Sequence, residues 1–238
     1  MALASTDPVG QTEETRLLRL GGAAGALGSA LLLGTFVFVA ALGLPDPSTT
    51  ESLLRFPEIK TARVVENTLY LAALVLMALH TLALSRTLRR TSPAASFFGG
   101  AVGVLGFTVL ICGALLHVAT APLADLHRDA PPEDKTTVVL VWQGVQSIFD
   151  TLLVTGAALV PFALIALGRA MLDSPAFGPA VGRTGLVLGV ISLTGAAVAV
   201  VIPGSLAVAA SILGLSAFHA VVGLKSYRRP SQPGSPAA

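Results

Sequence analysis

The chain has 238 residues, of which 53% are hydrophobic and 12% are charged, and its formal net charge is +2. Soluble domains carry about 25% charged residues, so this composition argues against an ordinary soluble protein. The sequence has no block of basic residues interleaved with aromatic side chains, so no nucleic-acid partner is expected. The single cysteine excludes an intrachain disulfide and a CxxC redox or zinc motif.

Long apolar runs predict an all-α, polytopic membrane protein with six transmembrane helices in a bundle. A spanning helix needs about 20 apolar residues. The last charge-free run, 184–224, would be about 60 Å long as one helix, roughly twice the hydrocarbon core. The Pro-Gly pair within 202–205 therefore predicts a turn at its middle. The expected helices are 20–44, 64–88, 95–121, 138–168, 182–202 and 205–227.

The two chain ends differ from this membrane domain. Residues 1–18 are expected to form a flexible cytoplasmic segment, and 19–229 the six-helix membrane domain. The tail 230–238 is rich in Pro, Ser and Gly, a composition typical of disorder.

Basic residues predict the orientation. With the N-terminus inside, ten Lys and Arg residues fall on the inner side and five on the outer side, together the fifteen in the chain. Positive charge favours the cytoplasmic side, so both termini are expected to be cytoplasmic. The preference for Arg over Lys, with abundant Ala and Gly, is typical of GC-rich bacterial coding sequences. The bacterial inner membrane is therefore the expected location.

Glycines four residues apart mark the first, third and fifth expected helices. This spacing lets a neighbouring helix approach closely, because no side chain intervenes. It predicts helix packing, and the same surfaces could bind a membrane-protein partner or a second copy of the chain. The pairs are Gly21 and Gly25, Gly99 and Gly103, and Gly185 and Gly189.

Polar side chains recur on one face of the fourth expected helix, where Gln143, Gln146 and Asp150 are spaced three and four residues apart. Counting from the helix ends places Asp150 nearest the midplane, where an ionisable group is by default a functional-site hypothesis. Tyr70 and His117 come out at similar depths below the outer boundary. These five residues predict an outward-facing pocket that binds or moves a small solute or a proton. The alternative is a purely structural hydrogen-bond ladder.

Two histidines repeat one pattern. His80 lies six residues before Arg86, and His219 lies six residues before Lys225. Both helices are expected to end on the cytoplasmic side, so the imidazoles share a depth of about 9 Å from that boundary. Paired axial histidines can hold a haem, so a haem b redox protein is an alternative hypothesis. A hydrogen bond between helices, or a duplicated hairpin, explains the pattern without a cofactor.

No GxSxG, HExxH or phosphate-loop motif occurs in a workable context. We therefore expect no catalytic residues, no metal site and no cofactor apart from the haem alternative. An enzyme is the least favoured class, and a non-catalytic accessory or scaffold subunit is the third hypothesis. The expected surroundings are the lipid bilayer.

Overall fold

The computed structural model describes residues 8–47, 49–202 and 207–228, and these residues form helices and no strands. Six spans are long and apolar enough to cross a membrane, with α3 and α4 counted as one span. The prediction of an all-helical chain with six helices long and apolar enough to span a membrane is thereby confirmed. The helices are α1 (Pro8–Leu42), α2 (Thr50–Leu88), α3 (Pro93–Val118), α4 (Thr120–Asp129), α5 (Pro132–Leu172), α6 (Gly178–Val201) and α7 (Ala207–Tyr227).

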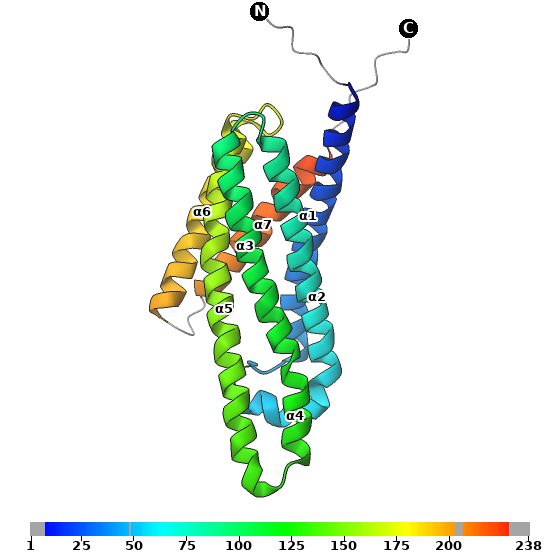
Figure 1. The fold of residues 1–238 in the computed structure, drawn as a ribbon, viewed down its shortest axis with the longest axis vertical. Coiled ribbons are helices and arrows are strands. Elements are labelled where there is room, and N and C mark those ends of the chain that lie inside the picture. Colours follow the sequence, from blue (N-terminus) through cyan, green and yellow to red (C-terminus); the bar gives the residue numbers. More distant parts are fainter. Residues whose placement is uncertain (1–7, 48, 203–206, 229–238) are drawn as a thin grey trace, which may run out of the picture.

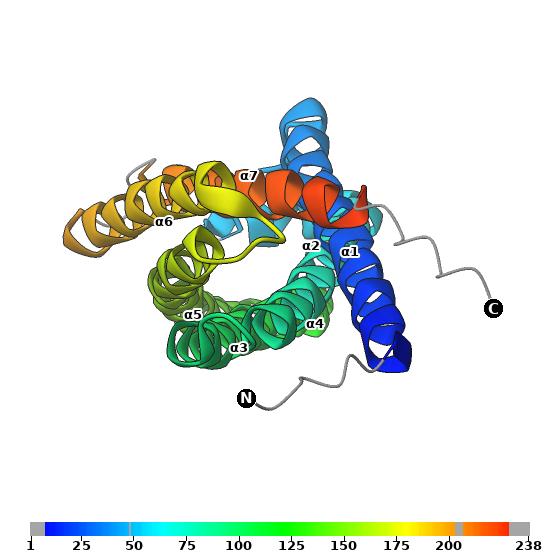
Figure 2. The same cartoon turned by 90° about the horizontal axis from the view of Figure 1, so that it is seen from above.

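The spanning helices form a ring. Each contacts its neighbours in chain order, and α7 closes the ring against α1 (Figure 2). Short connections make successive helices antiparallel. The first turns of α1 and the last turns of α7 therefore lie at the same end of the bundle (Figure 1). We call this the basic end, because it carries Arg86, Arg90, Arg169 and Lys225, and we call the opposite end the far end.

Glycines provide the close contacts between ring neighbours. A Cβ on Gly25 of α1 would overlap the His80 imidazole of α2. A Cβ on Gly168 of α5 would lie 2.7 Å from the Leu186 nitrogen and 2.9 Å from the Gly185 carbonyl carbon of α6. The backbones of α5 and α6 therefore touch directly, which only a residue without a side chain permits.

The helix α2 begins well before the expected start at residue 64. Thr49 caps it, because its side-chain oxygen accepts the Ser52 amide at 3.4 Å. Pro57 lies inside the helix, and the light blue first turns run across the bundle axis (Figure 1). A proline removes one helical hydrogen bond and kinks the chain. The expected start was counted from the apolar run, and charged residues interrupt a hydrophobic run without interrupting a helix.

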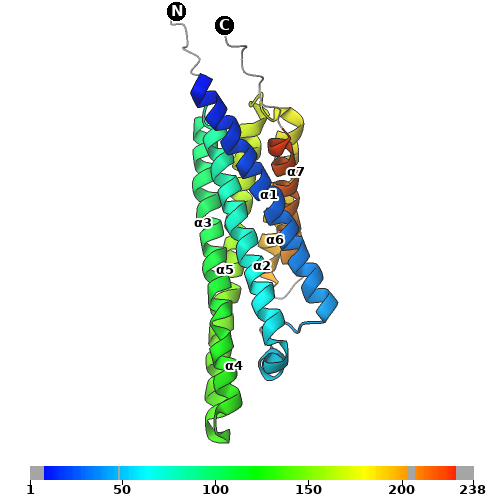
Figure 3. The same ribbon diagram turned by 90° about the vertical axis from the view of Figure 1, so that its right-hand side faces the viewer.

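Beyond the far end of α6 and α7, the helices α4 and α5 continue as a projection (Figure 3). α5 has 41 residues and is about 62 Å long, roughly twice the hydrocarbon thickness. A small second core, which includes Leu53, Phe56 and Trp142, joins the start of α2 to α4 and α5. The Phe56 and Trp142 rings meet edge to face at 5.9 Å, and Lys60 pairs with Asp125 at 2.7 Å.

At the basic end, α1 begins at Pro8, so much of the segment 1–18 that was expected to be flexible is helical. No helix-breaking residue follows Pro8 in this segment except Gly10, and Glu14 pairs with Arg90 at 2.8 Å. The expected Pro-Gly turn within 202–205 falls largely outside the described residues. The expected disordered tail 230–238 lies outside them altogether.

Replacing Gly168 by alanine is expected to lower the free energy of unfolding by about 1–3 kcal/mol, the usual effect of forcing a methyl group into a packed interface. The atoms that the methyl group would meet belong to the α6 backbone, which cannot move aside without shifting the helix. Thermal unfolding of the detergent-solubilised protein measures the change.

Gly144 is the matched control on the same helix, because a Cβ there would meet open space. Gly144→Ala is expected to stabilise the helix by up to about 1 kcal/mol. Equal effects of the two substitutions would contradict direct contact between α5 and α6 at Gly168.

Candidate functional site

A pocket of 490 Å³ opens in the far half of the bundle, between α1, α2, α3 and α5. Three of the five predicted pocket residues line it: Tyr70, His117 and Asp150. We call it the far pocket. Its other polar lining residues are Thr35, Asp46, Arg63, Glu66 and Asn67.

One face of α2 supplies most of the polar wall. Arg63, Glu66, Asn67 and Tyr70 recur at helical spacing and therefore share this face. The Arg63 side chain is only 2% exposed; it donates a hydrogen bond of 2.7 Å to Glu66 and another to the Pro45 carbonyl. A buried charge requires such pairing. Arg63 thus fastens the α1–α2 connection to the pocket wall.

From the sequence, Arg63 was counted among the five basic residues of the outer side and was not placed in the pocket. The helical spacing from Arg63 to Tyr70 was a usable signal. It was overlooked because α2 was expected to begin at residue 64.

His117 lies at the end of α3, is 6% exposed, and stacks against Phe149 with ring centroids 5.0 Å apart. Beside it lie Arg63 and Gln146. Gln146 is within hydrogen-bonding reach of the His117 imidazole and does not line the far pocket. His117 and Arg63 do line it, and neither His117 Nδ1 nor Arg63 Nε has a hydrogen-bond partner among the described residues. Buried polar atoms in folded proteins are almost always hydrogen-bonded, so these two atoms favour a polar ligand at this wall.

The three polar residues predicted to share one face of α5, Gln143, Gln146 and Asp150, have different surroundings. At about 100° per residue, Gln143 is turned about 60° to one side of Gln146 and Asp150 about 40° to the other. Gln146 is buried, and Gln143 is exposed and does not line the far pocket. Asp150 is exposed and turned into the pocket, where Asp46 repels its charge.

The level of Asp150 differs from the expectation. Ser211 Oγ donates a hydrogen bond of 3.1 Å to the Ala157 carbonyl, so Ala157 is level with the start of α7. Asp150 is two turns, about 10 Å, closer to the far end. It therefore lies closer to the far end than the first turn of α7. The expected depth was counted from Lys135, and the start of α5 projects beyond α6 and α7 (Figure 1).

The charge of the far pocket is predominantly negative. Asp46, Glu66 and Asp150 contribute three carboxylates, and Arg63 contributes the one guanidinium in the lining. The aromatic rings of Phe36, Tyr70 and Phe149 complete the walls. Carboxylates and aromatic faces both attract cations. The lining therefore suits a small solute with a positively charged group.

Towards the basic end, the far pocket is closed by apolar side chains. A narrow void of 20 Å³ lies below Tyr70 and is lined by Leu74, Leu110 and Leu215. Pro161 of α5 borders the same void. Because proline has no amide hydrogen, the Ala157 carbonyl lacks its helical partner, and Ser211 of α7 supplies the replacement hydrogen bond.

Deeper still, the structure brings His80 and His219 together. Their Nδ1 atoms are 2.9 Å apart, and neither side chain is exposed. A hydrogen bond between two Nδ1 atoms requires one imidazole to donate and the other to accept. The rings of Phe107 and Phe218 pack edge to face on His219.

A haem ligated by both histidines does not fit this arrangement. The imidazoles contact each other directly, so no plane can lie between them. The Gly25 backbone also closes against the His80 ring. Nor does any group of three or more His, Cys, Asp or Glu residues in the described ranges lie close enough to hold a metal ion.

Comparisons with protein-family models, with curated proteins and with solved structures give no match.

Replacing Arg63 by glutamine is expected to destabilise the protein by about 3–5 kcal/mol, because it leaves Glu66 without its partner in a largely enclosed wall. Arg55 provides the control, since it pairs with Glu51 at 3.1 Å on the exposed start of α2. Arg55→Gln is expected to change stability by less than about 1 kcal/mol. Thermal unfolding midpoints that fall by the same amount in both variants would contradict a structural role for the buried pair.

Proposed function

We propose that the protein is a six-helix membrane protein, of the bacterial inner membrane, that binds a small positively charged solute in the far pocket. The observation that supports this most directly is the lining. Three carboxylates face one guanidinium within a pocket of 490 Å³, and aromatic rings complete the walls. That volume is in the range of pockets for small molecules.

In this proposal both termini and the basic end face the cytoplasm. The excess of Lys and Arg at that end supports this orientation. The far pocket then faces outward, and solutes reach it without crossing the bilayer. The projecting parts of α4 and α5 stand beside its mouth on the outer side.

Movement of the solute, rather than binding alone, requires the apolar layer at Leu74, Leu110 and Leu215 to open. Pro161 and the Ser211–Ala157 hydrogen bond lie beside this layer. Helices bend most readily where a proline interrupts the hydrogen-bond ladder. The missing helical hydrogen bond at Pro161 supports a transport cycle in which α5 bends there and the apolar layer opens.

Solute binding is tested with the purified full-length protein and three ligands: choline, guanidinium and the uncharged choline isostere 3,3-dimethylbutan-1-ol. Isothermal titration and the thermal unfolding midpoint report binding. At least one cation is expected to bind, and the uncharged isostere is expected to bind at least about tenfold more weakly, because it makes no charge interaction with the carboxylates.

Asp150→Asn is expected to weaken binding of that cation by about tenfold or more, with the unfolding midpoint of the free protein unchanged. The control is Asp134→Asn, an exposed carboxylate in the first turn of α5 and outside the far pocket. Equal binding of the cation and the isostere would overturn the proposal. So would unchanged binding by Asp150→Asn with lowered stability, which would assign Asp150 to a structural network.

The orientation is tested by cysteine labelling. The background is Cys112→Ala, since the one native cysteine is exposed. In intact cells, a membrane-impermeant maleimide is expected to label Glu133→Cys at the far end. It is expected to label Thr91→Cys at the basic end only after permeabilisation. The reverse pattern would place the far pocket on the cytoplasmic side.

A further inference from the structure

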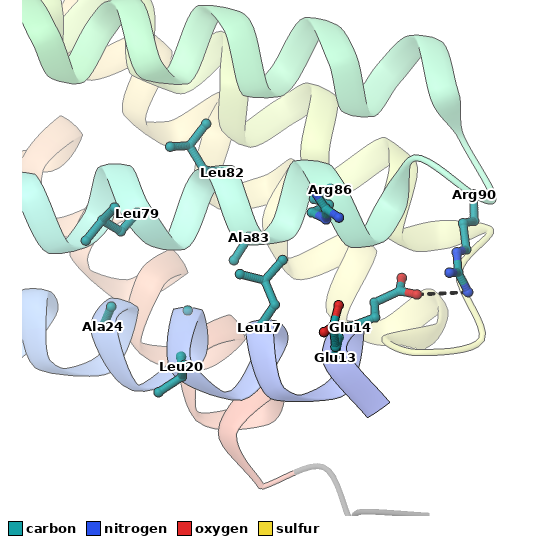
Figure 4. Close-up of a pocket in the computed structure, with 11 residues that line it drawn as sticks. Glu13, Glu14, Leu17, Leu20, Ala24, Leu79, Leu82, Ala83, Arg86 and Arg90 are labelled. Atoms are coloured by element: carbon teal, nitrogen blue, oxygen red, sulfur yellow. Dashed lines mark ion pairs between the residues drawn. The ribbon is translucent and has the colours of Figure 1, made fainter. Parts of the chain in front are cut away.

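A second hollow, of 790 Å³, lies at the basic end between the first turns of α1 and the last turns of α2 (Figure 4). We call it the α1–α2 groove. Its lining has a charged part and a larger apolar part. The charged part consists of Glu13, Glu14, Arg86 and Arg90, and the apolar part includes Leu20, Leu79 and Leu82.

Two of the four charged residues already form an ion pair with each other. Glu14 Oε2 and an Arg90 guanidinium nitrogen are 2.8 Å apart (Figure 4). Within the part of the chain that the structure describes, Glu13 and Arg86 form no ion pair. The groove therefore offers one carboxylate and one guanidinium for a ligand, and its formal charge is zero.

On both helices the charged side chains lie nearest the basic end, and the leucines lie deeper in the bundle. On α1 the charged Glu13 is outermost, and Leu20 is two turns deeper. On α2 Arg86 is near the end, and Leu82 and Leu79 are successively deeper. All three leucines are exposed. A phospholipid has the same order, with its charged headgroup outermost and its acyl chains deeper.

The floor of the groove is made of small residues. α1 and α2 meet where a Cβ on Gly21 would overlap the side chain of Ala83. Ala24 lines the groove beside them. Because these side chains are small, they leave room for an acyl chain to lie between Leu20 of α1 and Leu79 and Leu82 of α2.

We propose that the α1–α2 groove binds a phospholipid whose zwitterionic headgroup carries a primary ammonium, as in phosphatidylethanolamine. The phosphate binds Arg86, the ammonium binds Glu13, and an acyl chain lies along Leu20, Leu79 and Leu82. Basic side chains between membrane helices at the cytoplasmic surface are known to bind lipid headgroups. The acidic partner here adds a preference for a headgroup that also carries a cation.

The charge pattern distinguishes this lipid from two others. An anionic headgroup such as phosphatidylglycerol offers Glu13 only neutral hydroxyl donors, and its net negative charge is repelled by that carboxylate. Phosphatidylcholine has a quaternary ammonium without N–H donors, so it cannot form charge-assisted hydrogen bonds with a carboxylate. A primary ammonium can.

The test uses full-length protein in detergent, to which phosphatidylethanolamine, phosphatidylcholine or phosphatidylglycerol with identical acyl chains is added. Native mass spectrometry measures the bound fraction of each lipid. Phosphatidylethanolamine is expected to bind about fivefold more tightly than either competitor, the effect of one favourable charge contact near a membrane surface.

Two variants separate the contributions of the two charged groups. Glu13→Gln is expected to weaken phosphatidylethanolamine binding and strengthen phosphatidylglycerol binding, whereas Arg86→Gln is expected to weaken both. Arg183→Gln provides the control, because Arg183 is exposed on α6 outside the groove. Glu13 is itself exposed, so its replacement spares the Glu14–Arg90 pair and the fold.

Equal binding of the three lipids would overturn the proposal, because the groove would then be filled by bulk lipid without selection. A preference of the unmodified protein for phosphatidylglycerol would also overturn it and would show an anionic-lipid site. The far pocket is elsewhere in the bundle, so Asp150→Asn is expected to leave lipid selectivity unchanged.

Discussion

The structure depends on how closely its helix backbones approach one another. Lipid does not drive helices together as water does, so membrane helices associate through close packing and hydrogen bonds. Here glycines on α1, α3, α5 and α6 remove the side chains that would keep neighbours apart. The resulting contacts run around the ring in chain order. This leaves the inward faces of α2 and α7 to meet at His80 and His219, and it leaves the far pocket between the helices at the other end.

Polar groups inside the ring do two kinds of work. The bond between the Nδ1 atoms of His80 and His219 and the bond from Ser211 to the Ala157 carbonyl join helices that have few other contacts. The Nε2 atoms of both histidines are buried without a partner among the described residues, as are His117 Nδ1 and Arg63 Nε. The polar groups of the far pocket differ from the histidine pair because they border a space that a small solute could enter.

Much of the architecture could be predicted from the sequence, because hydrophobic length and charge position are direct consequences of the bilayer. The six spans and the packing role of the glycines follow from these rules. Helix starts could not be predicted in the same way, since α2 and α5 continue as helices outside the apolar runs. Positions counted from Lys135 at the start of α5, such as that of Asp150, were affected by this, whereas those counted from Arg86 and Lys225 correctly placed His80 and His219 at one level. Gln143 and Gln146 have the same chemistry, and which of them is buried depends on how α5 is rotated in the ring.

The hydrogen bond between Ser211 and the carbonyl freed by Pro161 has a mechanical consequence. α5 lacks one helical hydrogen bond at the Ala157 carbonyl, and the same carbonyl accepts the hydrogen bond from Ser211 of α7. Any change in the angle between the two halves of α5 must therefore pull on α7 or release it. α7 packs against α1 and carries His219. Strain that begins at the inner closure of the far pocket can therefore pass from α5 to α7 and from α7 to α1, without passing through α6.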